Sequence, residues 1–327
     1  MTQFIYAKID AANRSADRYL RGNGEIGSPC VPIYFDGAAD NEEEFLTSGG
    51  AKRQGQLFFE CGRNPANKFI VVIYGGEVVV LEPVGPIHFV KSEVQSGYDG
   101  FVKLLPVREV IRQPVKDVPA ILAGINANRY YSSGTFREIS DNGNKIALQC
   151  IVDKSKVQIP LQCTPIHALE CLSSVELETL VAKLFEELGC FVPAYRGGMI
   201  KDVDIFVHNN RSVELSLRGI TLLPKSRYTL QVKLRSSIKK VPYGVDYLIT
   251  GSDVSDPSIL GASWLSEAIK CSPATRDWLF SSLSWMPDAY LYSLLAPTTR
   301  KDVTPLNRKP GGLMEQSNAS LQRGDQG

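Results

Sequence analysis

No apolar run in this 327-residue sequence approaches the roughly 18 residues that a membrane-spanning helix requires. The first ten residues also lack the basic start and the apolar core of a signal peptide. We therefore expect a cytoplasmic protein without a membrane partner. Neither sign of charge is in excess: the net charge is +1, so any affinity for nucleic acid must come from local basic patches.

The signature motifs of several other protein classes are missing. The seven cysteines are odd in number and never form Cys-x-x-Cys pairs, which argues against structural zinc or a disulfide framework and favours buried free thiols. A phosphate-binding Gly-x-x-x-x-Gly-Lys-Ser/Thr loop is absent, so no ATP-hydrolysing site is predicted. His88, His167 and His208 lack a nucleophile-elbow context, which disfavours a Ser-His or Cys-His hydrolase.

Length and composition predict two folded domains. Apolar residues make up 43% of the chain and charged residues 22%, as in ordinary globular proteins. We predict a β-rich domain of the α+β class over residues 1–160 and an α/β domain over 165–297. Prolines bracket a linker at 160–165, and the polar tail 298–327 has the composition of a disordered segment.

The first domain is expected to contain a β-hairpin. Residues 68–74 and 77–81 are β-branched and apolar, and Gly75-Gly76 between them suits a tight turn. Further strands are predicted at 31–35, 56–60, 88–90 and 145–152, with short helices at 42–45 and 118–126.

The segment from Asn126 to Ile139 combines arginines with aromatic residues. Arg129, Tyr130 and Arg137 offer cations and a flat ring for phosphate contact and base stacking, beside Tyr131 and Phe136. The alternative is that the aromatics pack into the core while the arginines extend into solvent.

A helix with well-defined ends opens the second domain. Ser173 and Glu176 form a capping-box pattern, and Gly189 stands where a left-handed C-terminal residue is favoured. Apolar residues at helical spacing between these ends form one stripe. Glu178 lies at the edge of that stripe, so its carboxylate can reach over the edge of a sheet.

Two strands then bring polar side chains to one side of a sheet. Alternation over residues 201–207 places Asp202 and Asp204 on one face, and alternation over 228–234 places Gln231 and Lys233 together. The intervening residues 209–227 form a loop or an extra hairpin, in which Arg211 and Arg218 either contact phosphates or are ordinary surface residues. A strand at 245–251, a helix at 258–269 and a final helical segment at 277–295, interrupted at Pro287, follow.

These polar residues match the needs of phosphodiester cleavage, which requires an aligned water and positive charge at the transition state. A hard divalent cation supplies that charge and prefers oxygen ligands. Asp204 and Glu178 offer carboxylates, Gln231 offers an amide oxygen, and Lys233 can orient or stabilise the attacking hydroxide.

The motifs Leu177–Ala182, Val203-Asp204 and Gln231–Lys233 resemble those of the PD-(D/E)xK nucleases, in particular the Mrr-like restriction endonuclease domain. The resemblance implies a restriction-endonuclease-like domain with a mixed central sheet flanked by helices. It implies catalysis by Glu178, Asp204, Gln231 and Lys233, with Mg²⁺ (replaceable by Mn²⁺) on Glu178, Asp204 and Gln231. It further implies hydrolysis of double-stranded DNA in restriction or antiphage defence by a homodimer or higher homo-oligomer.

The sequence departs from that family in two respects. The interval from Asp204 to Gln231 is longer than the usual short hairpin, and Gln231 replaces the acidic residue of the classical motif. A neutral ligand makes Glu178 more important, and Asp202 is a candidate to replace the missing carboxylate. The first domain would then recognise the target or an activating ligand or partner. The alternative function is a noncatalytic nucleic-acid-binding or interaction module, because a fold can persist without its activity.

Overall fold

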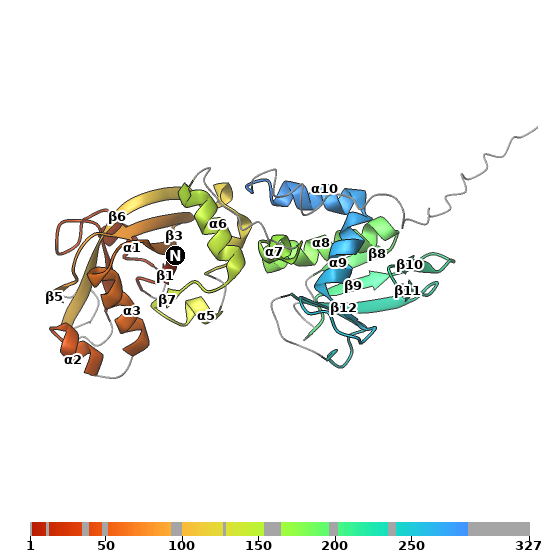
Figure 1. The fold of residues 1–327 in the computed structure, drawn as a ribbon, viewed down its shortest axis with the longest axis horizontal. Helices are drawn as coiled ribbons and strands as arrows, with labels where there is room; N and C mark the ends of the chain where they lie inside the picture. The colour runs from red at the N-terminus through yellow and green to blue at the C-terminus, as the bar shows by residue number, and fades with distance from the viewer. Residues whose placement is uncertain are drawn as a thin grey trace, which may run out of the picture. The chain divides into compact units, whose positions relative to one another are not determined.

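The computed structural model describes residues 2–10, 13–34, 39–47, 52–92, 100–126, 129–153, 165–195, 202–234 and 240–286. Within these ranges the protein is a mixed α/β structure with a curled seven-stranded sheet, a five-stranded sheet and a two-stranded hairpin (Figure 1). The chain up to Ala296 groups as one compact unit. The predicted linker lies almost wholly among residues 154–164, outside the described part, so the division into domains stays a prediction, as does the tail.

The seven-stranded sheet is built from residues of the first half of the chain. Its strands are β1 (Gln3–Ala7), β2 (Cys30–Ile33), β3 (Lys68–Tyr74), β4 (Glu77–Pro83), β5 (His88–Ser92), β6 (Gly100–Pro114) and β7 (Phe136–Glu138). They follow the order β2-β6-β4-β3-β1-β7, with β5 also paired to β6. β1 and β3 run parallel, and the other pairs are antiparallel. The predicted hairpin is β3–β4, whose turn residues Gly75 and Gly76 have φ angles of 57° and 78°.

Helices and alternating strand residues bury this sheet on both faces. The helical elements are α1 (Ala16–Leu20), α2 (Glu42–Thr47), α3 (Lys52–Arg63), the 3₁₀ turn η1 (Val115–Asp117), α4 (Ala120–Ala123), α5 (Arg129–Ser132) and α6 (Asn142–Asp153). Ile70 and Val72 of β3 belong to one buried cluster, and Val71 and Ile73 belong to another. Period-two alternation therefore supplies two apolar layers from a single strand.

Two predicted strands are helical instead. Residues 56–60 lie within α3, where Gly55, Phe58 and Phe59 are buried at the i, i+3, i+4 spacing of a helix. Residues 145–152 lie within α6, where Ala147 and Leu148 are buried one turn after Gly143. Each helix buries one apolar stripe, which a strand in the same place would have split between two faces.

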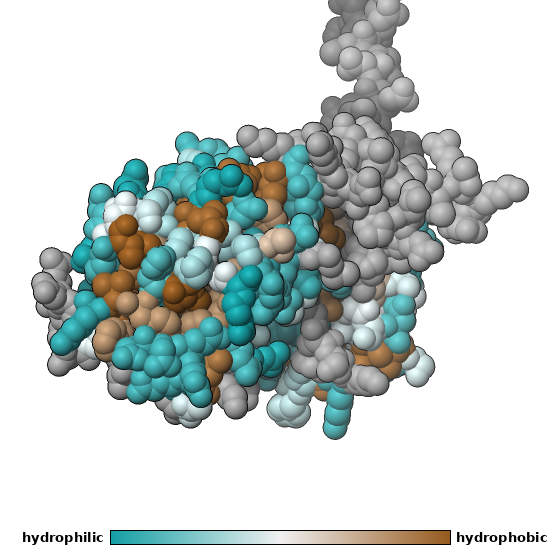
Figure 2. Space-filling view, turned by 60° about the vertical axis from the view of Figure 1, so that its left-hand side comes forward, coloured by the Kyte–Doolittle hydropathy of each residue, from teal (hydrophilic) through white to brown (hydrophobic). Residues whose placement is uncertain are grey.

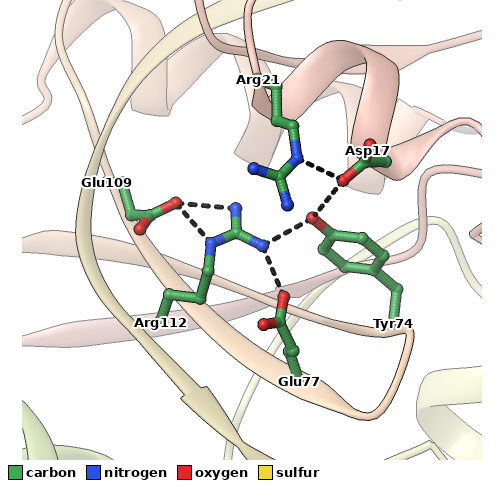
Figure 3. A network of polar contacts seen from close by, with 6 residues as sticks. All are labelled: Asp17, Arg21, Tyr74, Glu77, Glu109 and Arg112. Carbon is green, nitrogen blue, oxygen red and sulfur yellow. Dashed lines mark hydrogen bonds and ion pairs between the residues drawn. The ribbon is translucent and has the colours of Figure 1, made fainter.

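A polar network connects α1 to the edge of the β3–β4 hairpin and to β6 (Figure 3). The guanidinium group of Arg112 donates hydrogen bonds to the Tyr74 hydroxyl and to Glu77, both at 2.7 Å. It also binds Glu109 at 2.7 and 2.9 Å. Tyr74 in turn donates to Asp17 of α1 at 3.5 Å. The network joins elements that lie far apart along the chain.

The molecular surface mixes polar and apolar residues, as Figure 2 shows for one face. Val84 and Val110 are among the large apolar side chains that remain exposed. None of the helices that the structure describes combines the length and apolar character needed to cross a membrane.

No disulfide links the cysteines that have a described position. Cys30, Cys61, Cys171 and Cys190 are buried, Cys150 is half-buried and Cys271 is exposed, whereas Cys163 lies outside the described residues. Burial raises the pKa of the Cys30 and Cys61 thiols to about 12.

The five-stranded sheet comes from the second half of the chain. Its strands are β8 (Phe191–Tyr195), β9 (Ile205–His208), β12 (Arg227–Lys233), β13 (Tyr247–Thr250) and β14 (Ile259–Leu260), in the order β14-β13-β12-β9-β8. β12, β13 and β14 run parallel, whereas β9 is antiparallel to both β12 and β8. The sheet is therefore mixed, and the hairpin β10 (Leu215–Leu217) and β11 (Ile220–Leu222) fills the interval between β9 and β12.

Helices α7 (Pro165–Glu170), α8 (Ser174–Leu188), α9 (Ala262–Lys270) and α10 (Pro273–Ser282) accompany this sheet. α8 packs beside β8 and β9, and α9 packs beside β13. Residues of the helices and strands share one buried cluster, the C-terminal cluster, which includes Leu180, Leu230 and Leu265. The predicted helix at 258 starts later, because residues 259 and 260 form β14, and the part of the final helical segment beyond Met286 lies outside the described residues.

Candidate active site

Helix α8 has the ends that the sequence predicts. The Ser173 hydroxyl accepts a hydrogen bond from the Glu176 N–H at 3.2 Å, and the Glu176 carboxylate accepts one from the Ser173 N–H at 2.9 Å. At the other end Gly189 adopts a φ of 99° and donates its N–H to Glu186. These caps fix the position of the helix that carries Glu178.

Asp204 stands directly before β9 and is tied to β12 by its backbone and its side chain. Its N–H donates to the Leu230 carbonyl at 2.9 Å. One carboxylate oxygen, Oδ2, accepts hydrogen bonds from the Val232 N–H at 2.8 Å and from the Lys233 ammonium at 3.3 Å. The Asp204 side chain is 19% exposed and that of Lys233 is 40% exposed, so the ion pair faces solvent on one side.

Gln231 lies between Leu230 and Val232, the two β12 residues whose backbone groups bond to Asp204. The residue is only 2% exposed, although the strand pattern alone predicts an open polar face. Its Nε2 donates to Asp202 Oδ1 at 3.4 Å, while its Oε1 is buried and has no hydrogen-bond partner among the described residues. A buried acceptor without a partner costs on the order of 1–3 kcal/mol. This oxygen is therefore suited to a donor or a cation.

Glu178 lies half-buried on α8, the helix that packs beside β8 and β9. Glu178 is therefore on a helix next to the strand that Asp204 precedes. The approach of its carboxylate to Asp204 remains a prediction. Across the described ranges, no group of three or more His, Cys, Asp or Glu side chains is arranged to hold a metal ion. A cation at Asp204 would therefore need the amide oxygen of Gln231 as part of its ligand set. Carboxylate and amide oxygens fit a hard cation such as Mg²⁺.

His208 lies at the opposite end of β9 from Asp204. Four residues of extended strand separate the two by about 13 Å. Burial and the nearby Arg227 both hold the pKa of His208 below its usual range. This histidine therefore belongs to the far end of the strand rather than to the Asp204 site.

The predicted nucleic-acid-binding residues near α5 divide between surface and core. The guanidinium carbon of Arg137 lies 4.6 Å from the centre of the Tyr130 ring, and Tyr130 is 46% exposed. Tyr131 and Phe136 are buried, and the Tyr131 hydroxyl donates to Asp141 at 3.0 Å. The core interpretation is therefore right for Tyr131 and Phe136, whereas Tyr130 is exposed and contacts the half-buried Arg137. The side chain of Arg129 lies outside the described part.

The two predicted arginines near the β10–β11 hairpin have different surroundings. Arg218 forms an ion pair with Glu267 of α9 at 2.7 Å, so its charge is already neutralised within the fold. Arg211 is exposed, and its guanidinium lies so close to Gly189 that a Cβ there would meet it at 2.2 Å. A cation in that place stabilises the C-terminal end of α8, where the helix dipole is negative.

Comparisons of the chain with protein-family models, with curated proteins and with solved structures found no match. The case for a class of function therefore rests on the site itself. Sequence reasoning brought Asp204, Gln231 and Lys233 to one place. It missed the Val232 N–H, because a backbone donor leaves no trace in the residue pattern.

Proposed function

We propose that the protein is a metal-dependent endonuclease that hydrolyses phosphodiester bonds in double-stranded DNA. Residues 165–297 would form a restriction-endonuclease-like domain of the PD-(D/E)xK type, and the first half would recognise the target or an activating signal. The observation that carries the proposal is the 3.3 Å contact between Asp204 and Lys233, beside the buried Gln231, whose Oε1 has no partner in the described part of the chain.

In this proposal each side chain has a distinct task. Asp204 and Gln231 would hold Mg²⁺ or Mn²⁺, with Glu178 as a further ligand from α8. The bound cation supplies positive charge that polarises water and the scissile phosphate. Hydrogen bonds to Val232 and Lys233 occupy Oδ2 of Asp204 and fix the carboxylate plane, leaving Oδ1 for the cation. The Lys233 ammonium can then stabilise negative charge that develops during attack.

A noncatalytic nucleic-acid-binding module is the second candidate. The observation that favours it is the lack, among the described residues, of a group of three acidic, His or Cys side chains able to hold a metal. A site with fewer charged ligands binds divalent cations more weakly. The nuclease fold would then persist as a scaffold.

Cleavage of plasmid and linear DNA with Mg²⁺, Mn²⁺ or EDTA separates these candidates. We expect the wild-type protein to cut with either metal, and Asp204→Asn and Lys233→Met to lose at least about 100-fold in rate. Asp277→Asn, on a side chain that is 75% exposed, is the matched control and should cut normally. A wild-type protein that binds DNA but does not cut it with either metal would favour the noncatalytic module.

A further inference from the structure

Only one of the two ends of the Gln231 side-chain amide can bind a cation. The oxygen is a ligand, whereas the NH₂ group is a donor that would repel the cation. The two ends are nearly equal in size, so hydrogen bonding must select which end faces the cation. In the described structure the NH₂ end donates to Asp202 Oδ1 at 3.4 Å, and Oε1 is left without a partner.

We propose that Asp202 is a positioning residue that holds the Gln231 amide with its oxygen toward the cation site. The inference rests on the proposed function for the presence of that cation. An ionised carboxylate only accepts hydrogen bonds, so it attracts the amide NH₂ and repels the amide oxygen. Turning the amide over would place two oxygens side by side and lose the hydrogen bond. Asp202 thereby converts a neutral side chain into an oriented oxygen ligand.

The backbone at Asp202 supports this role. Its φ angle is 69°, in the left-handed region that most side chains avoid. Two residues later the Asp204 N–H bonds to Leu230, which anchors the chain against β12. The turn at Asp202 thus brings its carboxylate to Gln231 while Asp204 reaches Val232 and Lys233. Non-glycine residues in strained conformations concentrate at functional sites.

Three substitutions at position 202 separate positioning from other roles. Asp202→Ala and Asp202→Gly remove the acceptor, and glycine also relieves the backbone. Asp202→Asn removes the charge and keeps an acceptor oxygen for Gln231 Nε2, although its NH₂ group can also donate to Oε1, so it selects the amide orientation less strictly than aspartate. A positioning role predicts that Mn²⁺ affinity, measured by electron paramagnetic resonance of free Mn²⁺, falls roughly tenfold or more in the Ala and Gly variants and by a smaller factor in the Asn variant.

Stability supplies a readout that separates positioning from a merely structural role. Asp202→Ala and Asp202→Gly both leave Gln231 Nε2 without this acceptor, but because glycine is favoured at positive φ, Asp202→Gly should unfold in urea at a higher midpoint than Asp202→Ala. A positioning role predicts equal loss of Mn²⁺ affinity in the two variants despite this difference in stability. Equal loss of affinity in the Asn and Ala variants would overturn the proposal in favour of Asp202 as a charged ligand.

A measurement without metal tests the contact itself. The side-chain NH₂ resonances of Gln231, identified by their loss in Gln231→Glu, should shift in Asp202→Ala and stay near their wild-type positions in Asp202→Asn. Resonances that do not respond to Asp202→Ala would overturn the proposal whatever the metal data show. A wild-type protein that shows the shift but binds no Mn²⁺ would instead refute the proposed cation site and leave the Asp202–Gln231 contact established.

Discussion

A neutral amide at position 231 changes the charge balance of the candidate site. Asp204 contributes one negative charge, which the ammonium of Lys233 at 3.3 Å offsets. Gln231 adds an oxygen but no charge. In the proposed site, further attraction for a divalent cation would have to come from Glu178 of α8, whose approach to Asp204 is a prediction. Weak metal affinity that depends on Asp204 and Glu178 is the expected consequence.

Ser173 is the residue at which a local motif has the clearest effect on stability. Its hydroxyl and the Glu176 carboxylate satisfy two N–H groups at the start of α8. We expect Ser173→Ala to lower the free energy of unfolding by about 1 kcal/mol, measured by urea denaturation. Ser174→Ala is the control, because Ser174 is exposed and lies within the helix. Equal losses in both variants would contradict the capping role.

The sequence predicts those features of the site that follow from short motifs and from strand alternation. The ends of α8 follow from Ser173, Glu176 and Gly189, and strand alternation predicts that Asp204 and Lys233 meet. The burial of Gln231 does not follow from alternation, because it depends on what covers the sheet. The left-handed backbone of Asp202 is equally hidden, since aspartate is compatible with several turn conformations.

At the scale of elements, the predicted secondary structure was wrong for two short apolar runs. Residues 56–60, Gln-Leu-Phe-Phe-Glu, suit a buried strand as well as one turn of helix. The decision came from tertiary packing, which buries Phe58 and Phe59 together with Gly55 on one helical face. The run at 145–152 became helix α6 for the same reason. β12 alternates along its seven residues and is predictable from periodicity, whereas β3 is predictable from its β-branched residues and the Gly75-Gly76 turn that follows it.

The hairpin β10–β11 is held against α9 by its turn. Arg218 pairs with Glu267 at 2.7 Å, and the Trp264 indole donates to the Arg218 carbonyl at 3.1 Å. Glu267 also binds Lys270 at 2.7 Å. Hydrogen bonding from Lys270, the largest cause, and the charge of Arg218 hold the pKa of Glu267 below its usual range. The folded state therefore favours the ionised carboxylate.

This lowered pKa gives the Arg218–Glu267 pair a defined pH dependence. Its stabilisation is fully present above the unfolded-state pKa of Glu, about 4.3, and is lost as pH falls through the lower folded-state pKa. We expect Arg218→Ala to cost about 0.5–1 kcal/mol at pH 7 and nearly nothing once Glu267 is protonated. Urea denaturation of both proteins from pH 7 to pH 3 checks this, with exposed Arg53→Ala as control. A cost that does not change with pH would refute the pairing.

At the scale of the whole molecule, the sequence did not predict which strands pair when they lie far apart along the chain. β1 pairs with β3 through Gln3 and Lys68, and with β7 through Ala7 and Phe136. Such contacts join residues more than 60 positions apart, and local periodicity carries no information about them. A mixed α/β structure was therefore predictable in outline, whereas the order of the seven-stranded sheet was not.

The seven-stranded and five-stranded sheets have distinct buried clusters. We therefore expect a core substitution in one sheet to lower the stability of that sheet more than that of the other. Leu81 of β4 and Leu180 of α8 are both fully buried, in the seven-stranded sheet and in the C-terminal cluster respectively. Replacing either leucine by alanine should cost about 2–5 kcal/mol. Trp264 and Trp278 pack against the C-terminal cluster, whereas Trp285 packs against both this cluster and a cluster of the seven-stranded sheet. In a Trp285→Phe background, tryptophan fluorescence therefore reports on the C-terminal cluster.

We therefore expect Leu180→Ala to lower the urea midpoint followed by tryptophan fluorescence, and Leu81→Ala to lower chiefly an additional transition seen by circular dichroism. Independent transitions would show that the predicted division near residues 160–165 separates two folding units. If both variants lower the fluorescence midpoint equally, the chain up to Ala296 unfolds as one cooperative unit. The proposed recognition of a target by the first half would in that case be coupled to the stability of the half that carries Asp204.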